Sequence, residues 1–70
     1  MEPQLRVGAN IKARRTELGL TQEAAAHRAS LHPVEFARAE RGLRDLRLST
    51  ICKIAVGLSI EAGELLKGLP

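Results

Sequence analysis

Hydrophobic residues recur along the chain with the spacing of amphipathic helices, and no stretch alternates apolar and polar side chains as a strand would. A first helix is predicted over residues 4–18, with a face made of Leu5, Gly8, Ile11, Arg15 and Leu18. A later helix is predicted over residues 48–58, with an inward face made of Leu48, Ile51, Ile54, Ala55 and Leu58. The pattern therefore indicates an all-α fold.

Cap and turn residues mark two shorter helices between these. Thr21 is a suitable N-cap for a helix over residues 22–29. Pro33 can begin a helix over residues 33–41, because the first position of a helix does not need the N–H that proline lacks. The segment Ser30-Leu31-His32 then forms a tight turn between the two helices.

Two short helices joined by a tight turn, here over residues 22–41, have the spacing of a DNA-binding helix-turn-helix. Helices that cross steeply need a small residue where they touch, and Ala26 can supply it. Leu31 and Phe36 are expected to fill the core beneath the turn, which leaves the outer face of the second of these helices for the major groove. The alternative interpretation is a helical hairpin inside an ordinary bundle.

Chain length adds an expectation of self-association. With a short last helix over residues 62–67, the 70 residues are expected to form a single domain (1–70), a compact five-helix bundle. A core this small usually needs a disulfide, a bound metal or a second chain to be stable. Cys52 is the only cysteine, which rules out a disulfide within the chain, and with two histidines it makes no metal-ligand set. A homodimer is therefore expected.

Several leucines near the end of the chain are candidates for the dimer contact. Leu46, Leu66 and Leu69 are as well explained by a two-fold interface as by core packing, whereas Ile60 and Leu65 are assigned to the core. A dimer would carry two recognition helices about one DNA turn apart.

Two further side chains have structural expectations only. Cys52 is expected to lie at the boundary between core and surface, and Arg14 is expected to face solvent.

Charge and composition narrow the class of partner. Lys and Arg outnumber Asp and Glu by 11 to 8, which is compatible with nucleic acid. Phe36 is the only aromatic residue, which argues against single-stranded nucleic acid, because its bases stack on aromatic side chains. Double-stranded DNA is the expected partner.

Other function classes find little support in the sequence. No nucleophile with a matching base, carboxylate pair or phosphate loop is present, so we expect no enzyme activity, no cofactor and no metal. No apolar run is long enough to span a membrane and no signal peptide opens the chain. The expected location is cytoplasmic, at the nucleoid, with no membrane partner.

A set of short motifs occurs in a characteristic order: Gly19-Leu20-Thr21-Gln22-Glu23, Ala26, Glu40-Arg41-Gly42, Lys53-Ile54-Ala55, Leu58 and Glu64-Leu65-Leu66. Over about residues 11–66 the chain therefore resembles the lambda-repressor/Cro-like (XRE-type) helix-turn-helix family. The resemblance implies a transcriptional regulator that binds a near-palindromic operator as a homodimer. At this size it is similar to restriction-modification controller proteins, small phage-type repressors and self-repressing antitoxins, and the loop at residues 44–46 slightly favours the controller type.

The resemblance also implies roles for residues that do not contact bases. Gln22 corresponds to a residue that contacts a DNA phosphate, a task that a helix N-terminus also suits. Lys12, Arg41 and Arg44 are candidates for further phosphate contacts. Arg15 and Glu40 correspond to a buried ion pair that orients the recognition helix.

Base contacts are expected from the exposed face of the third helix, at His32, Pro33, Val34, Ala37 and Arg38. Arg38 is the strongest candidate, because a guanidinium can bond both acceptors of a guanine edge. Val34 can pack on a thymine methyl. His32 is equally well explained as a cap or turn residue and as a DNA contact.

Several residues depart from the family pattern. Ser30 stands where the turn usually has a glycine in the left-handed conformation. Pro33 and Val34 replace polar residues at the start of the recognition helix, and Glu35 places a negative charge near the phosphates. Pro33, Val34 and Glu35 support the alternative that the chain is a protein-interaction module, antitoxin-like, which has kept the fold and lost specific base contacts.

Overall fold

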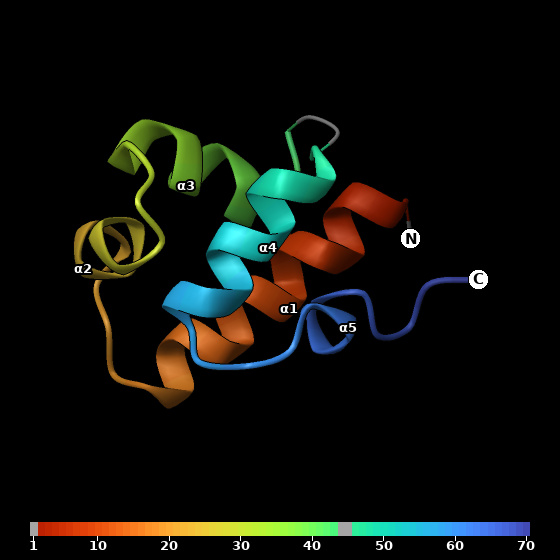
Figure 1. The fold of residues 1–70 in the computed structure, drawn as a ribbon. Helices are drawn as coiled ribbons and strands as arrows, with labels where there is room; N and C mark the ends of the chain where they lie inside the picture. Colours follow the sequence, from red (N-terminus) through yellow and green to blue (C-terminus); the bar gives the residue numbers. More distant parts are fainter. Residues whose placement is uncertain (1, 44–45) are drawn as a thin grey trace.

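Five helices follow one another in the computed structural model, which describes residues 2–43 and 46–70 (Figure 1). They are α1 (Pro3–Glu17), α2 (Gln22–Arg28), α3 (Pro33–Glu40), α4 (Leu48–Gly57) and α5 (Ala62–Leu65). These two ranges contain no strand. The all-α, five-helix prediction is confirmed, with ends within one residue of those expected except that α5 stops two residues earlier.

The predicted cap and turn residues occupy the positions expected of them. The Thr21 hydroxyl accepts a hydrogen bond from the Ala24 N–H at 3.0 Å, and Pro33 is the first residue of α3. Gly19 ends the turn after α1 with a φ of 68°. Ser30 adopts a φ of 57° in the turn between α2 and α3, so a serine takes the left-handed conformation that usually belongs to glycine.

The core lies where the five helices meet. Its largest fully buried side chains are Phe36, Ile11, Ile54, Leu58 and Leu65. Leu31 is half-buried and packs against this cluster, and Ala26 is fully buried beside it. The expected packing beneath the turn is therefore confirmed.

Two glycines allow helices to approach closely. A Cβ at Gly8 of α1 would lie 2.5 Å from the Glu40 carbonyl oxygen of α3. A Cβ at Gly57 of α4 would lie 2.7 Å from the Ala29 nitrogen, just after α2. These contacts seat the helix-turn-helix directly on α1 and α4.

The helix-turn-helix lies at one side of the molecule and α5 at the other, where both chain ends also lie (Figure 1). α1 packs against α3 and α5, and α4 packs against α2 and α5, while α2 and α3 contact each other. No helix within the described ranges is long and apolar enough to cross a membrane. Because α3 packs on α1 and α2 through its inner face, its outer face points away from the rest of the bundle.

Three positions differ from the sequence prediction because they lie at helix starts or on outer faces. Leu5, in the first turn of α1, is 44% exposed and lies over Gly42 instead of in the core. Leu48 is the first residue of α4 and is 70% exposed, so it lies outside the core. Cys52 is exposed on α4 and fills no boundary position.

Arg14 also differs from the expectation that it faces solvent. Its Nε donates to the Leu58 carbonyl at 2.9 Å and its Nη2 to the Ser59 carbonyl at 3.3 Å. The last carbonyls of a helix lack partners within the helix, and a cationic side chain satisfies them well. Arg14 therefore fastens α1 to the end of α4.

Candidate nucleic-acid interface

The outer face of α3 presents most of the residues predicted to contact bases. Val34 and Arg38 lie one turn apart and are exposed, and Arg41 continues the same face one turn further. The opposite face, with Phe36, Ala39 and Glu40, is buried. His32 and Pro33 are exposed at the start of α3, whereas Ala37 is half-buried at the edge of the face.

A buried ion pair holds α3 on α1. The Arg15 Nε lies 2.6 Å from Glu40 Oε2, and its Nη2 donates to Oε1 at 2.8 Å. The Glu40 side chain is 4% exposed and that of Arg15 is 14% exposed. A third bond joins the Arg15 Nη1 to the Leu20 carbonyl at 2.8 Å. The predicted ion pair thus takes the two-point geometry that fixes both partners most firmly.

The environment of Glu40 keeps its carboxyl ionised. Burial alone would raise its pKa, but the hydrogen bonds from Arg15 and Gln22 outweigh burial and hold the pKa below the usual value for a glutamate. The hydrogen bond with Glu40 in turn raises the pKa of Arg15. The pair is therefore fully charged at neutral pH.

One of the predicted phosphate-contacting residues is bonded to this ion pair. The Gln22 Nε2 donates to Glu40 Oε1 at 3.0 Å, a contact that the sequence analysis missed. The positive charge of Lys12 also helps to lower the pKa of Glu40. Because an amide nitrogen has two hydrogens, Gln22 keeps one donor after this bond. The first residue of α2 is thus tied to the last residue of α3.

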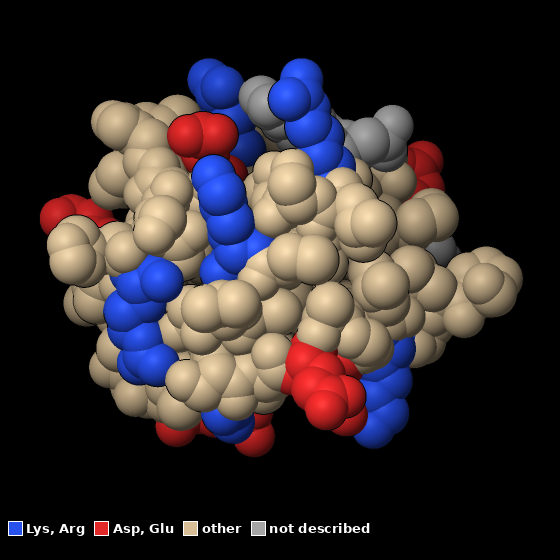
Figure 2. Space-filling view, viewed as in Figure 1, with Lys and Arg blue, Asp and Glu red and all other residues tan. Residues whose placement is uncertain are grey.

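The remaining cations predicted to contact DNA lie on the surface where the structure describes them. Arg38, Arg41 and Lys12 are all exposed, whereas Arg44 lies outside the described residues. In Figure 2 several Lys and Arg side chains lie along the upper edge, beside α3 and the start of α4, with acidic side chains interspersed. Among the described residues, Arg38 forms no ion pair.

His32 takes the cap role that was one of its two interpretations. Its Nδ1 accepts a hydrogen bond from the Val34 N–H at 3.1 Å, which makes it the N-cap of α3. The cap defines where the recognition helix starts.

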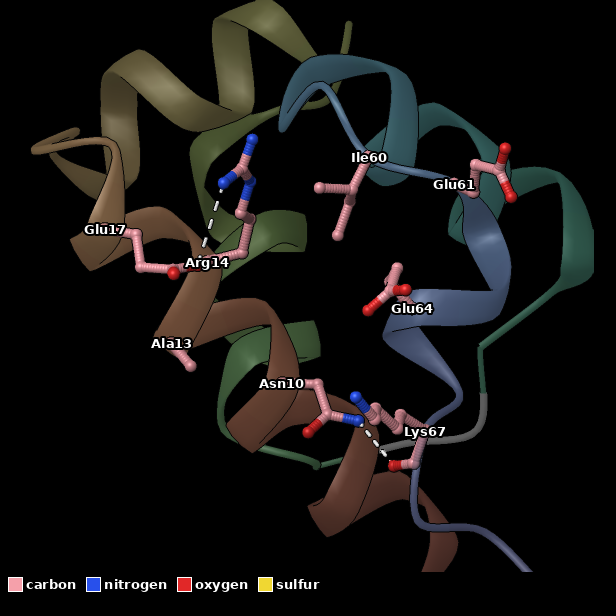
Figure 3. A pocket seen from close by; sticks show the side chains of 8 residues that line it. All are labelled: Asn10, Ala13, Arg14, Glu17, Ile60, Glu61, Glu64 and Lys67. Carbon is pink, nitrogen blue, oxygen red and sulfur yellow. Dashed lines mark hydrogen bonds and ion pairs between the residues drawn. The ribbon is translucent and has the colours of Figure 1, made fainter.

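A hollow between α1 and α5 has the opposite electrostatic character (Figure 3). Its acidic side chains come from Glu17, Glu61 and Glu64. Of its donors, Asn10 bonds the carbonyls of Leu65 and Lys67 and Arg14 bonds the end of α4, while the Lys67 ammonium stands opposite three carboxylates. A hollow of this composition does not suit a phosphate backbone.

The three leucines predicted for the dimer contact share one apolar groove. Leu46, Leu66 and Leu69 line it together with Pro3, Gln4, Val7 and Ile51, around a volume of about 280 Å³. All three are half-buried and pack against the core from the outside. They are thus brought together, with one side of each left accessible.

Comparison with known proteins identifies the same motif. A helix-turn-helix family model matches residues 11–65. The restriction-modification controller protein C.AhdI from Aeromonas hydrophila is similar in structure, with a TM-score of 0.85 and 35% sequence identity over 89% of this chain and 94% of that one. A comparison with curated protein sequences finds no match.

Two further solved structures have the same fold at 28% identity. The hypothetical transcription factor NHTF from Neisseria has a TM-score of 0.88 over 93% of this chain and 75% of that one. The controller protein C.Esp1396I has a TM-score of 0.84 over 93% of this chain and 84% of that one. The chain belongs to the lambda-repressor/Cro-like (XRE-type) helix-turn-helix family of DNA-binding regulators.

Proposed function

We propose that the protein is a homodimeric transcriptional regulator that binds a near-palindromic operator in double-stranded DNA, with α3 in the major groove. The observation that carries the proposal is the outer face of α3. This face exposes Arg38 without an ion-pair partner among the described residues, while the buried Arg15–Glu40 pair holds the helix from behind.

Base contacts are assigned to the exposed residues of that face. Arg38 can donate to both acceptors of a guanine edge, and Val34, 48% exposed, can pack on a thymine methyl. Pro33 and His32 contact the same groove from the start of the helix. Ala37, being half-buried, contributes a close van der Waals contact at the edge of the face.

Phosphate contacts are assigned to the residues around the ion pair. Gln22 keeps one donor after its bond to Glu40, and Lys12 and Arg41 are exposed cations. Arg44 stays in this group as a prediction from the sequence. Contacts of this kind position the protein on DNA and make its affinity depend on salt.

The dimer is assigned to the groove lined by Leu46, Leu66 and Leu69. Exposed apolar surface of this kind gains stability when a partner covers it. A two-fold contact would bring two copies of α3 to the same side of the duplex. Likeness to two controller proteins, one of them 35% identical over nearly its whole length, makes control of a restriction-modification system the favoured biological role.

Selection from a random duplex library, followed by fluorescence anisotropy on the selected sequence, tests the proposal. The wild type is expected to bind the selected duplex at least about a thousandfold more tightly than a random one. Arg38→Ala should lose about tenfold or more of that affinity. Lys67→Ala is the matched control, because it removes one positive charge beside the hollow of Figure 3 and should change binding little. Equal binding of selected and random duplexes would contradict the proposal.

Analytical ultracentrifugation tests the dimer. The wild type and Val56→Asp, which changes an exposed residue of α4, should sediment as dimers at micromolar concentration. Leu69→Asp should sediment as a monomer, because a carboxylate in the groove cannot be buried against a partner. A monomeric wild type, or a dimeric Leu69→Asp, would rule out this interface.

A protein-interaction module remains the second candidate function. The exposed apolar side chain of Val34 and the neighbouring carboxylate of Glu35 are the observations that favour it. It predicts that no duplex is preferred in the selection and that Arg38→Ala leaves the residual binding unchanged.

A further inference from the structure

The cap of α3 determines which nitrogen of His32 carries a proton. Nδ1 accepts the Val34 N–H at 3.1 Å, so this nitrogen carries no hydrogen. In the neutral ring the hydrogen is therefore on Nε2, the other nitrogen, which acts as a donor only. His32 is exposed, and within the described residues Nε2 has no hydrogen-bond partner. The ring thus presents one donor of fixed position at the start of the recognition helix.

Most backbone N–H groups at this point are absent or already bonded. Pro33, the first residue of α3, has no N–H, and the N–H of Val34 is occupied by the cap. The Phe36 N–H bonds the His32 carbonyl at 3.1 Å. Of the backbone donors in this first turn, the Glu35 N–H alone has no acceptor among the described residues, so the His32 ring and this N–H are the donors available at the start of α3.

The charge of Glu35 decides whether a phosphate or a base edge is the better acceptor for this ring donor. Glu35 is exposed in the same first turn of α3, three residues beyond His32, and would repel a phosphate. Base edges carry no net charge, and in the major groove they offer acceptors at purine N7, guanine O6 and thymine O4. A base edge is thus the favoured acceptor for Nε2–H.

We propose that His32 is a specificity-determining residue, which caps α3 through Nδ1 and donates its Nε2–H to a base acceptor in the major groove. The inference rests on the proposed DNA binding and adds which kind of base edge is preferred at one position. At one base pair of each half-site, a base edge that presents an acceptor to the ring is selected, and one that presents an amino group is rejected.

The cap itself is tested without DNA. Long-range 15N NMR spectra should show Nδ1 of His32 unprotonated and Nε2 protonated, with His27→Gln used to assign the two rings. His32→Asn keeps a good capping side chain and should retain the melting temperature, whereas His32→Ala should lower it by about 5 °C. A proton on Nδ1, or equal melting of all three proteins, would overturn the cap.

The base contact is tested on the selected duplex. His32→Asn keeps the cap and lacks the ring donor, so it should bind about tenfold more weakly and lose the preference at one base pair. If the preferred base is a purine, its 7-deaza analogue should weaken the wild type by a similar factor and leave His32→Asn unaffected. For a selected thymine, the matching analogue is 4-thiothymine. The control His27→Asn, on the exposed side of α2, should behave as the wild type.

The outcomes separate this inference from the function on which it rests. A loss that is equal on selected and random duplexes would assign the donor to a phosphate and overturn the specificity role. Unchanged binding by His32→Asn would overturn the role of His32 alone. Absence of any duplex preference in the wild type would overturn both proposals.

Discussion

Arg15 of α1 and Glu40 of α3 form a two-point ion pair, with N···O distances of 2.6 and 2.8 Å. Glu40 is the last residue of α3, and its carboxylate also accepts from Gln22, the first residue of α2. One buried carboxylate therefore joins three helices and sets the angle at which α3 leaves the bundle. The pair contacts no base in the proposed complex, but every base contact depends on its geometry.

Removing one partner of this pair should destabilise the fold severely. Arg15→Met leaves the Glu40 carboxylate buried with only Gln22 beside it, and we expect a loss of about 3–5 kcal/mol. Urea unfolding followed by circular dichroism measures the loss. Glu17→Ala is the control, because its contact with Arg14 is 3.7 Å long and exposed, so its effect should stay within about 0.5 kcal/mol.

The double variant Arg15→Met/Glu40→Leu extends this test. It leaves no unpaired buried charge, so it should be more stable than Arg15→Met alone. If Arg15→Met costs no more than Glu17→Ala, the ion pair does not hold α3.

Acid should weaken the fold through the same carboxyl. The pKa of Glu40 is lower in the folded chain than in an unfolded one, so the unfolded chain binds the proton more readily. The stability that Glu40 contributes is present at neutral pH and is lost as the pH falls through the usual range of a glutamate, about pH 4, and below. Unfolding free energies at about pH 7 and pH 3 should therefore differ more for the wild type than for Glu40→Gln. An equal difference in the two proteins would contradict this assignment.

Much of the fold follows from the sequence because helix ends depend on local chemistry. Thr21 and Pro33 begin helices through their own side chains, and Gly19 ends a turn through its backbone freedom. Positions that depend on distant neighbours could not be predicted in this way. Arg14 bonds carbonyls 44 and 45 residues away, and Leu48 is exposed although it continues the apolar face of α4.

In the candidate site, too, features that depend on distant neighbours could not be predicted from the sequence. The resemblance named both partners of the Arg15–Glu40 pair, since the pair belongs to the family framework. The bond from Gln22 to Glu40 was missed, because it depends on how α2 and α3 meet in space. The cap by His32 was one of two open interpretations, and only coordinates could show that Nδ1 reaches the Val34 N–H.

The close approach of α1 and α3 is tested at Gly8. Gly8→Ala adds a Cβ that would lie 2.5 Å from the Glu40 carbonyl, so the helices must separate, and we expect a loss of about 1–3 kcal/mol. Gly63→Ala in α5 is the control. Nothing lies within 4 Å of its added Cβ, so it should gain about 0.5–1 kcal/mol from helix propensity. Thermal unfolding of both variants measures the difference, and a neutral Gly8→Ala would contradict the close contact.

The turn between α2 and α3 carries backbone strain that a glycine would relieve. Ser30 has a φ of 57°, where a side chain costs about 1–2 kcal/mol relative to glycine. Ser30→Gly should therefore raise the free energy of unfolding by about 1 kcal/mol in denaturant titrations. Ser49→Gly, in the first turn of α4, should instead lower it by up to about 1 kcal/mol. A destabilising Ser30→Gly would show that the serine is not strained there.

An NMR titration shows which face of the protein binds duplex DNA. The selected duplex is added to the 15N-labelled protein, and shifts of the backbone amides are mapped onto the fold. If the outer face of α3 binds the duplex, we expect the largest shifts at Val34 and Arg38 in α3 and at Gln22 in α2, with α5 unaffected. Shifts confined to α4 and α5, or none at a duplex excess, would contradict it.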